Sequence, residues 1–183
     1  MKFPARTVML GIALVATACS SAQRARNAVA VANAIMYNTG GAPIGTAQLT
    51  QDQNGLVFVE IASISLPAGV HGIHFHDVGK CDVGTTPAFS SAGGHYNPMA
   101  RQHGLENPNG PHAGDNPNIT IPDNGVGRVS FSTDRVSLTP GTTSLLDADG
   151  SALVIHAAAD DQVSNPAGNS GARIACGVVK ALP

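Results

Sequence analysis

Seven histidines are the residues of this chain best suited to carry chemistry, and all of them lie between positions 71 and 156 of its 183 residues. Three occur in the string HGIHFH at 71–76. On a β-strand successive side chains point to opposite faces, so His74 and His76 share a face and His71 lies on the other. Two imidazoles on one face can chelate one ion, and imidazole nitrogen suits copper and zinc. Taken alone, such a pair more often decorates a surface than binds a metal.

A second group of candidate ligands follows in GGHYNP (93–98), QHG (102–104) and HAGD (112–115). Its members are His95, His103, His112 and Asp115. Because His112 and Asp115 are three positions apart, a local turn can bring both side chains to one ion. Three imidazoles with one carboxylate form a plausible tetrahedral zinc ligand set.

Short β-strands between turn signals are predicted to position these residues. The candidate strands are Val29–Tyr37, Gly45–Thr50, Leu56–Ser65, Gly72–His76, Gly127–Thr133, Ala152–His156 and Ile174–Val179. No stretch shows sustained helical periodicity, so the sequence predicts an all-β fold, an antiparallel Greek-key β-sandwich or flattened barrel. The 48 residues from Asp77 to Asn124 interrupt this pattern. So long a stretch without strands predicts a functional loop pinned by its ligands.

The first eighteen residues predict an export signal. Lys2 and Arg6 precede an apolar run over 8–18 that is too short to span a bilayer as a helix. The sequence Ala16-Thr17-Ala18-Cys19 resembles a bacterial lipoprotein signal with Cys19 as the lipid-carrying residue, and an ordinary secretory cleavage nearby remains open. We therefore expect a signal peptide at 1–18, a flexible tether at 19–32 and one folded domain at 33–183.

Cysteine usage agrees with export. If Cys19 carries lipid, Cys81 and Cys176 remain as candidate disulfide partners in an oxidising compartment. Two buried free thiols are the alternative.

The charge and composition exclude one class of function. Charged residues make up 12% of the chain, aromatics 4%, and the net charge is −2, which gives no basis for nucleic-acid binding. From Asn33 onward six basic residues stand against twelve acidic ones, a net of −6. An anionic substrate would therefore have to be attracted locally rather than by the whole domain.

Five strings in fixed order carry a resemblance to a known family. They are HGIHFH (71–76), GGHYNP (93–98), HAGD (112–115), VIHAAADD (154–161) and GNSGARIACG (168–177). Together they resemble the copper/zinc superoxide dismutase family in its bacterial secreted branch, over about residues 45–180. The resemblance implies an immunoglobulin-like Greek-key sandwich with long metal-binding and electrostatic loops, and copper and zinc as cofactors.

The resemblance also implies a role for each site residue. Copper would be bound by His74, His76, His95 and His156. Zinc would be bound by His95, His103, His112 and Asp115, with His95 bridging the two ions and handling a proton. Asp160 would orient one ligand of each metal, and Arg173 would lie beside copper to meet the anion. His71 would be structural, and Cys81 would pair with Cys176.

The expected function is thus disproportionation of superoxide to oxygen and hydrogen peroxide by a copper that cycles between two oxidation states. The alternative is an envelope protein that buffers copper and zinc without turnover. We expect superoxide as the substrate, no nucleic-acid partner, membrane contact only through Cys19, and a location in the bacterial periplasm or cell envelope. A monomer and a homodimer both remain open.

Overall fold

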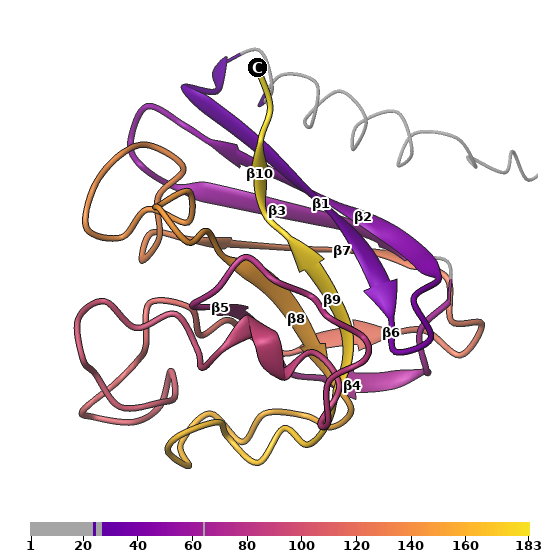
Figure 1. Cartoon of the computed structure of the whole chain (residues 1–183). Helices are drawn as coiled ribbons and strands as arrows, with labels where there is room; N and C mark the ends of the chain where they lie inside the picture. Colours follow the sequence, from indigo (N-terminus) through magenta and orange to yellow (C-terminus); the bar gives the residue numbers. More distant parts are fainter. Residues whose placement is uncertain (1–23, 25–26, 64) are drawn as a thin grey trace, which may run out of the picture.

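A computed structural model describes residues 24, 27–63 and 65–183, and almost all regular structure in this part of the chain is β-strand (Figure 1). The elements are β1 (Ala30–Asn38), β2 (Pro43–Gln51), β3 (Val57–Ser63), β4 (Gly69–His71), β5 (Ile73–His76), the 3-10 helix η1 (Ser90–Ala92), β6 (Ile119–Ile121), β7 (Gly127–Thr133), β8 (Ala152–His156), β9 (Arg173–Val178) and β10 (Lys180–Ala181). No helix of these described residues is long and apolar enough to cross a membrane.

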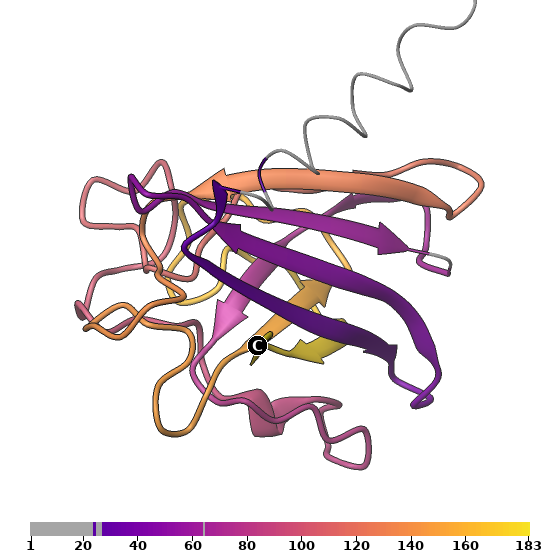
Figure 2. The same ribbon diagram turned by 90° about the horizontal axis from the view of Figure 1, so that it is seen from above.

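One antiparallel sheet runs in the order β5-β8-β9-β1-β2-β3-β7, with β10 paired to β1, and β4 and β6 form a separate pair. The sheet curls, so that its two ends lie across a common interior (Figure 2). Ile61 of β3 and Phe75 of β5 accordingly belong to the same buried core. Chain order and sheet order differ because the connections after β3 and β7 cross between the ends of the sheet, as in Greek-key folds. The predicted all-β sandwich or flattened barrel is confirmed.

The structure corrects several details of the predicted organisation. β1 begins at Ala30, and Ala32 is fully buried opposite Leu49, so the folded domain starts before Asn33. Within the predicted loop Asp77–Asn124 lie η1 and β6. β6 was missed because three residues show no usable periodicity, and its strand character comes from pairing with β4. The predicted signal peptide and Cys19 lie outside the described residues.

Alternation along β5 separates a packing face from a ligand face. Ile73 and Phe75 are fully buried in the main core. His74 and His76 alternate with them, so they lie on the opposite face of the sheet. That face is covered by the loops that follow β5 and β8, and these loops complete the site.

Candidate metal centre

Two clusters of potential metal ligands lie against the ligand face of β5 and β8. The first, the four-histidine cluster, consists of His74, His76, His95 and His156. Each contributes a nitrogen, and these atoms all lie within 4.8 Å of one another. His95 belongs to both clusters. The second, the carboxylate cluster, is centred on Asp115 and takes in His95, His103 and His112.

The four-histidine cluster presents unpartnered nitrogens to one point. Within the described part of the chain, the buried ring nitrogens without a hydrogen-bond partner are Nδ1 of His74 and Nε2 of His76, His95 and His156, together with Nδ1 of His112 in the other cluster. Buried polar atoms are normally paired, so four orphaned nitrogens from one cluster indicate a missing common partner. The opposite ring nitrogens are already engaged: His76 Nδ1 lies 3.1 Å from the Gly93 carbonyl, and His156 Nδ1 lies 3.1 Å from that of Gly171. An all-imidazole donor set of this kind fits copper.

The carboxylate cluster is organised by one oxygen. Asp115 Oδ1 lies 2.9 Å from His95 Nδ1, 3.0 Å from His103 Nδ1 and 3.3 Å from His112 Nδ1. Its other oxygen, Oδ2, accepts the backbone N–H groups of Gly104 and His112, both at 2.9 Å. Three imidazole nitrogens around one carboxylate fit a tetrahedral zinc site.

His74 also has a nitrogen within 4.8 Å of the ligand atoms of His95, His103 and Asp115. Its Nε2, however, donates to Asp160 Oδ2 at 2.6 Å, which leaves Nδ1 for the four-histidine cluster. We therefore group His112 rather than His74 with Asp115.

Asp160 joins the two clusters without belonging to either. Its Oδ2 accepts from His74, and its Oδ1 lies 3.0 Å from His103 Nε2. Asn118 holds the backbone of Asp160 by two hydrogen bonds of 2.8 Å, one to the N–H and one to the carbonyl. A carboxylate that orients one ligand of each cluster fixes which ring nitrogen faces the ion. Asn118 escaped sequence reasoning because asparagine is common in this glycine- and proline-rich loop.

The two clusters hold protons differently. Burial lowers the pKa of His95 to about 4 and that of His156 to about 3, and it lowers the pKa of His76 well below its usual value. Burial opposes protonation of His103 too, but hydrogen bonds to Asp115 and Asp160 raise its pKa to about 9. The same hydrogen bonds overcome burial in the two aspartates and hold each carboxyl pKa below its usual range.

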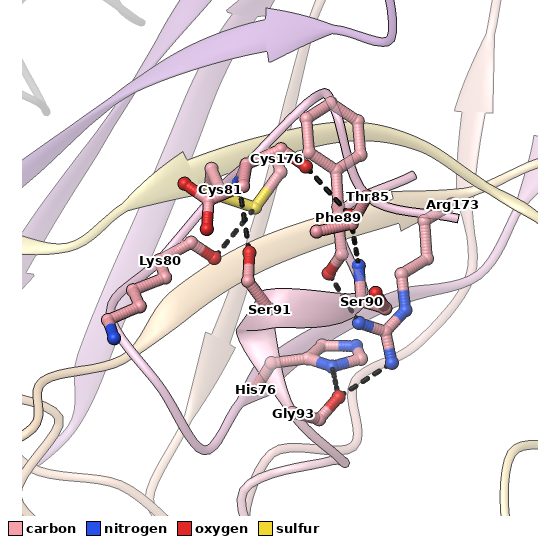
Figure 3. Close-up of a disulfide and its surroundings, with 11 residues drawn as sticks. His76, Lys80, Cys81, Thr85, Phe89, Ser90, Ser91, Gly93, Arg173 and Cys176 are labelled. Carbon is pink, nitrogen blue, oxygen red and sulfur yellow. Dashed lines mark hydrogen bonds between the residues drawn. A yellow bond between two sulfur atoms is a disulfide. The ribbon is translucent and has the colours of Figure 1, made fainter. Parts of the chain in front are cut away.

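The loop that carries Cys81, Phe89 and Gly93 positions Arg173 next to His76 of the four-histidine cluster (Figure 3). Arg173 Nη1 donates to the Phe89 carbonyl and Nη2 to the Gly93 carbonyl, both at 2.6 Å. The Gly93 carbonyl also lies against His76 Nδ1, so the guanidinium and a candidate ligand share one acceptor. The predicted disulfide between Cys81 and Cys176 is confirmed, and it ties this loop to β9, the strand that begins with Arg173.

Comparison with known proteins agrees with this arrangement. The family described as "Copper/zinc superoxide dismutase (SODC)" matches residues 43–179. The chain belongs to the copper/zinc superoxide dismutase family. "Superoxide dismutase [Cu-Zn] 1" of Aquifex aeolicus is 47% identical over 150 residues, which cover 81% of this chain and 86% of the relative. "Superoxide dismutase [Cu-Zn]" of Caulobacter vibrioides is 40% identical over 152 residues, or 81% and 85% of the two chains.

Solved structures agree as well. A crystal structure of a SOD-like protein from Bacillus subtilis, in a double mutant that replaces a tyrosine and a proline by histidine, matches with a TM-score of 0.74. It is 38% identical, and the match covers 80% of this chain and 95% of that one. As a copper/zinc superoxide dismutase, the protein is an oxidoreductase whose cofactors are copper and zinc. The two clusters are able to hold these ions.

His71 lies apart from both clusters. Its Nδ1 is 2.7 Å from the His156 carbonyl and its Nε2 is 3.0 Å from the Pro67 carbonyl, so both nitrogens are engaged with backbone. The sequence predicted that His71 would be separated from His74 and His76 by alternation along one strand, but the three residues lie on two different strands. The chain changes from β4, in the small sheet, to β5, in the large sheet, at Gly72. A superoxide dismutase of this sequence therefore uses His71 to join two sheets at the base of the site.

Gly114, in the string HAGD, lies where three segments of the site pack together. Its carbonyl accepts the Phe75 N–H at 2.9 Å, and its own N–H donates to the Tyr96 carbonyl at 2.8 Å. A side chain at this position would overlap the Phe75 carbonyl and come within 3.0 Å of the Tyr96 nitrogen. Only glycine lets the segment bearing Asp115 pack directly along β5 and the segment bearing His95.

Proposed function

We propose that this protein is an exported superoxide dismutase in which His74, His76, His95 and His156 bind copper and His95, His103, His112 and Asp115 bind zinc. The observation that carries the proposal is the position of His95. Its Nδ1 lies 2.9 Å from Asp115 in the carboxylate cluster, while its Nε2 is one of the orphaned nitrogens of the four-histidine cluster. One imidazole with a nitrogen for each cluster is suited to bridge two ions.

Copper in such a site supplies reversible one-electron exchange, and zinc supplies a redox-inert positive charge. The overall reaction oxidises one superoxide to oxygen and reduces a second to hydrogen peroxide, which takes up two protons. His95 Nε2 is the atom that we propose holds one of these protons and releases it to the product. Its ring is suited to this because Nδ1, which lies on the side of Asp115, would be held by zinc and keep the ring oriented while Nε2 changes partner.

Arg173 is proposed to receive the anion. Two of its N–H groups are bound to the Phe89 and Gly93 carbonyls, which hold the guanidinium plane and leave its other donors for a ligand. Burial lowers the pKa of Arg173, but from a value so high that the side chain stays charged. Within a domain of net charge −6 this fixed cation provides attraction where the domain as a whole repels.

Export to the periplasm or cell envelope, with a lipid on Cys19, completes the proposal. The disulfide between Cys81 and Cys176 is of the kind that persists in oxidising compartments. Mass measurement of the mature N-terminus tests the anchor, because lipid attachment at Cys19 adds the mass of the lipid and cleavage before Cys19 removes residues 1–18.

Activity is tested by measuring superoxide consumption with metal content determined in the same sample. We expect the copper- and zinc-loaded protein to consume superoxide rapidly and His95→Ala to lose at least about 100-fold of that rate. The metal-buffer alternative predicts instead that fully loaded parent protein binds both metals and has no activity beyond free copper. That result would refute the proposed superoxide dismutase activity.

A further inference from the structure

Arg135 lies directly after β7 and reaches the carboxylate cluster from outside. Its Nη2 donates to the backbone carbonyl of Asp115 at 2.6 Å. The side chain is half-buried, and its Nε is buried without a hydrogen-bond partner. Arg135 belongs to none of the five sequence strings and is not a ligand of either cluster.

The guanidinium of Arg135 is not explained by an ion pair. Among residues 24, 27–63 and 65–183, the only arginine or lysine within 4.0 Å of a carboxylate oxygen is Arg128, which lies 3.8 Å from Glu60. Arg135 therefore does not pair with its neighbour Asp134 at that distance. Burying a cation without an ion pair is unfavourable. The hydrogen bond from Arg135 to the Asp115 carbonyl therefore indicates a role for this arginine at the carboxylate cluster.

The contact completes the support of Asp115. Its carboxylate oxygen Oδ2 is held by the N–H groups of Gly104 and His112, and its backbone carbonyl is held by Arg135. With the peptide and one oxygen both held, Oδ1 stays at the point where it meets the three histidine nitrogens. Hydrogen bonds to charged donors are stronger than neutral ones, so the guanidinium is a firm anchor.

We propose that Arg135 is a positioning residue for the zinc site, which acts by fixing the peptide of Asp115. The inference rests on the zinc ligands proposed above. Arg135 also lines a surface hollow of about 340 Å³ together with Met99, Arg101 and Thr143. Because the side chain is only half-buried at this surface, we expect its replacement to disturb the sheet less than the loss of a core residue would.

The test compares zinc affinity, by competition with a chromophoric chelator, in the parent, R135M, R135K and R128M. R135M removes the donor and keeps the aliphatic stem. R128M, the control, removes an exposed arginine near the start of β7, at the other end of the strand that Arg135 follows. We expect R135M to bind zinc about tenfold more weakly, with copper affinity unchanged, as for other residues that orient metal ligands. R135K, which can donate to the same carbonyl, should return to within about threefold of the parent. R135Q, shorter and uncharged, takes the place of R135M if that variant does not fold.

Cobalt bound in the zinc site gives a second readout, since its visible absorption spectrum reports ligand geometry. The spectrum should change in R135M and resemble the parent in R135K and R128M. Zinc affinity of R135M within twofold of the parent with the same cobalt spectrum overturns the inference, as does equal weakening in R128M or a failure of R135K to recover. A parent protein that binds no zinc refutes the proposed function instead, so the two failures are distinguishable.

Discussion

The four-histidine cluster and the carboxylate cluster share His95, yet they differ in how many of their polar atoms are hydrogen-bonded within the protein. In the first, four buried nitrogens have no hydrogen-bond partner among the residues that the structure describes. In the second, Asp115 pairs with a nitrogen of His95 and one of His103, and Asp160 extends the network; among its described nitrogens, His112 Nδ1 lies near the carboxylate without a hydrogen bond. The first cluster is held by hydrogen bonds on the far side of each ring. The second is held by hydrogen bonds among its own ligand atoms.

This difference teaches how one imidazole can serve two sites with separate properties. Buried imidazoles with a lowered pKa, such as His76 and His156, can bind an ion at neutral pH without losing a proton. In the carboxylate cluster, Asp115 and Asp160 stabilise the protonated form of His103, so this histidine must lose its proton before it can bind an ion. The consequence is that changes on one side of His95 should alter copper, and changes on the other side should alter zinc and the pH dependence of its binding.

The sharpest way to break the comparison is to remove one ligand from each cluster alone. His156→Ala should abolish measurable superoxide consumption, a loss of at least about 100-fold, and leave zinc binding intact. His112→Ala should weaken zinc by a similar factor while copper binding persists, so its loss of activity should be smaller. Metal content and activity measured on the same samples check both. Equal loss of both metals in the two variants would show that the clusters are not separable.

A second prediction uses two glycines of the loop after β8. Both Gly168 and Gly171 have a positive φ, at 60° and 78°. A side chain on Gly168 would overlap Asp160 Oδ1 and come within 2.6 Å of His103 Nε2, whereas one on Gly171 would find its nearest neighbour at 3.7 Å.

Gly171→Ala should therefore lose only about 1 kcal/mol of unfolding free energy through backbone strain. Gly168→Ala should lose more and should also weaken zinc about tenfold, because it separates Asp160 from His103. Thermal unfolding and chelator competition measure the two effects. The same zinc affinity in both alanine variants would contradict the orienting role of Asp160.

The smallest expected effect is the proton count on metal binding. Below pH 9 the apoprotein carries a proton on His103, whose pKa is raised to about 9, and zinc must displace it. His95 and His156, with pKa values lowered to about 4 and 3, carry none at pH 7. Zinc should release roughly one proton at pH 7, and its affinity should fall about tenfold per pH unit below 9.

Copper added to the zinc-loaded protein should release about one proton as well, because His95 must give up its remaining N–H when both of its nitrogens bind ions. Calorimetric titration in two buffers with different ionisation enthalpies measures both numbers. Copper binding without proton release would contradict the bridging role of His95.

Sequence reasoning succeeded where a pattern is local. β7 and β8 have the predicted boundaries because alternating or continuous apolar residues end at turn residues on both sides. It missed β4 and β6, whose three-residue strands exist through pairing with each other. It could not find the Phe89 and Gly93 carbonyls that hold Arg173, because every residue carries a carbonyl and none is marked by its side chain.

The sequence by itself determined the chemistry of this protein: histidine and aspartate as donors, an all-β frame, a pair of imidazoles on one face, and the family. Tertiary structure alone decided which nitrogen of each ring faces which cluster, since that choice depends on partners far away in the chain. His74 is oriented by Asp160, 86 positions away, and Asp115 is held by Arg135 across 20 positions. Ligand type is a property of one residue, whereas ligand direction is a property of the hydrogen bonds that folding assembles.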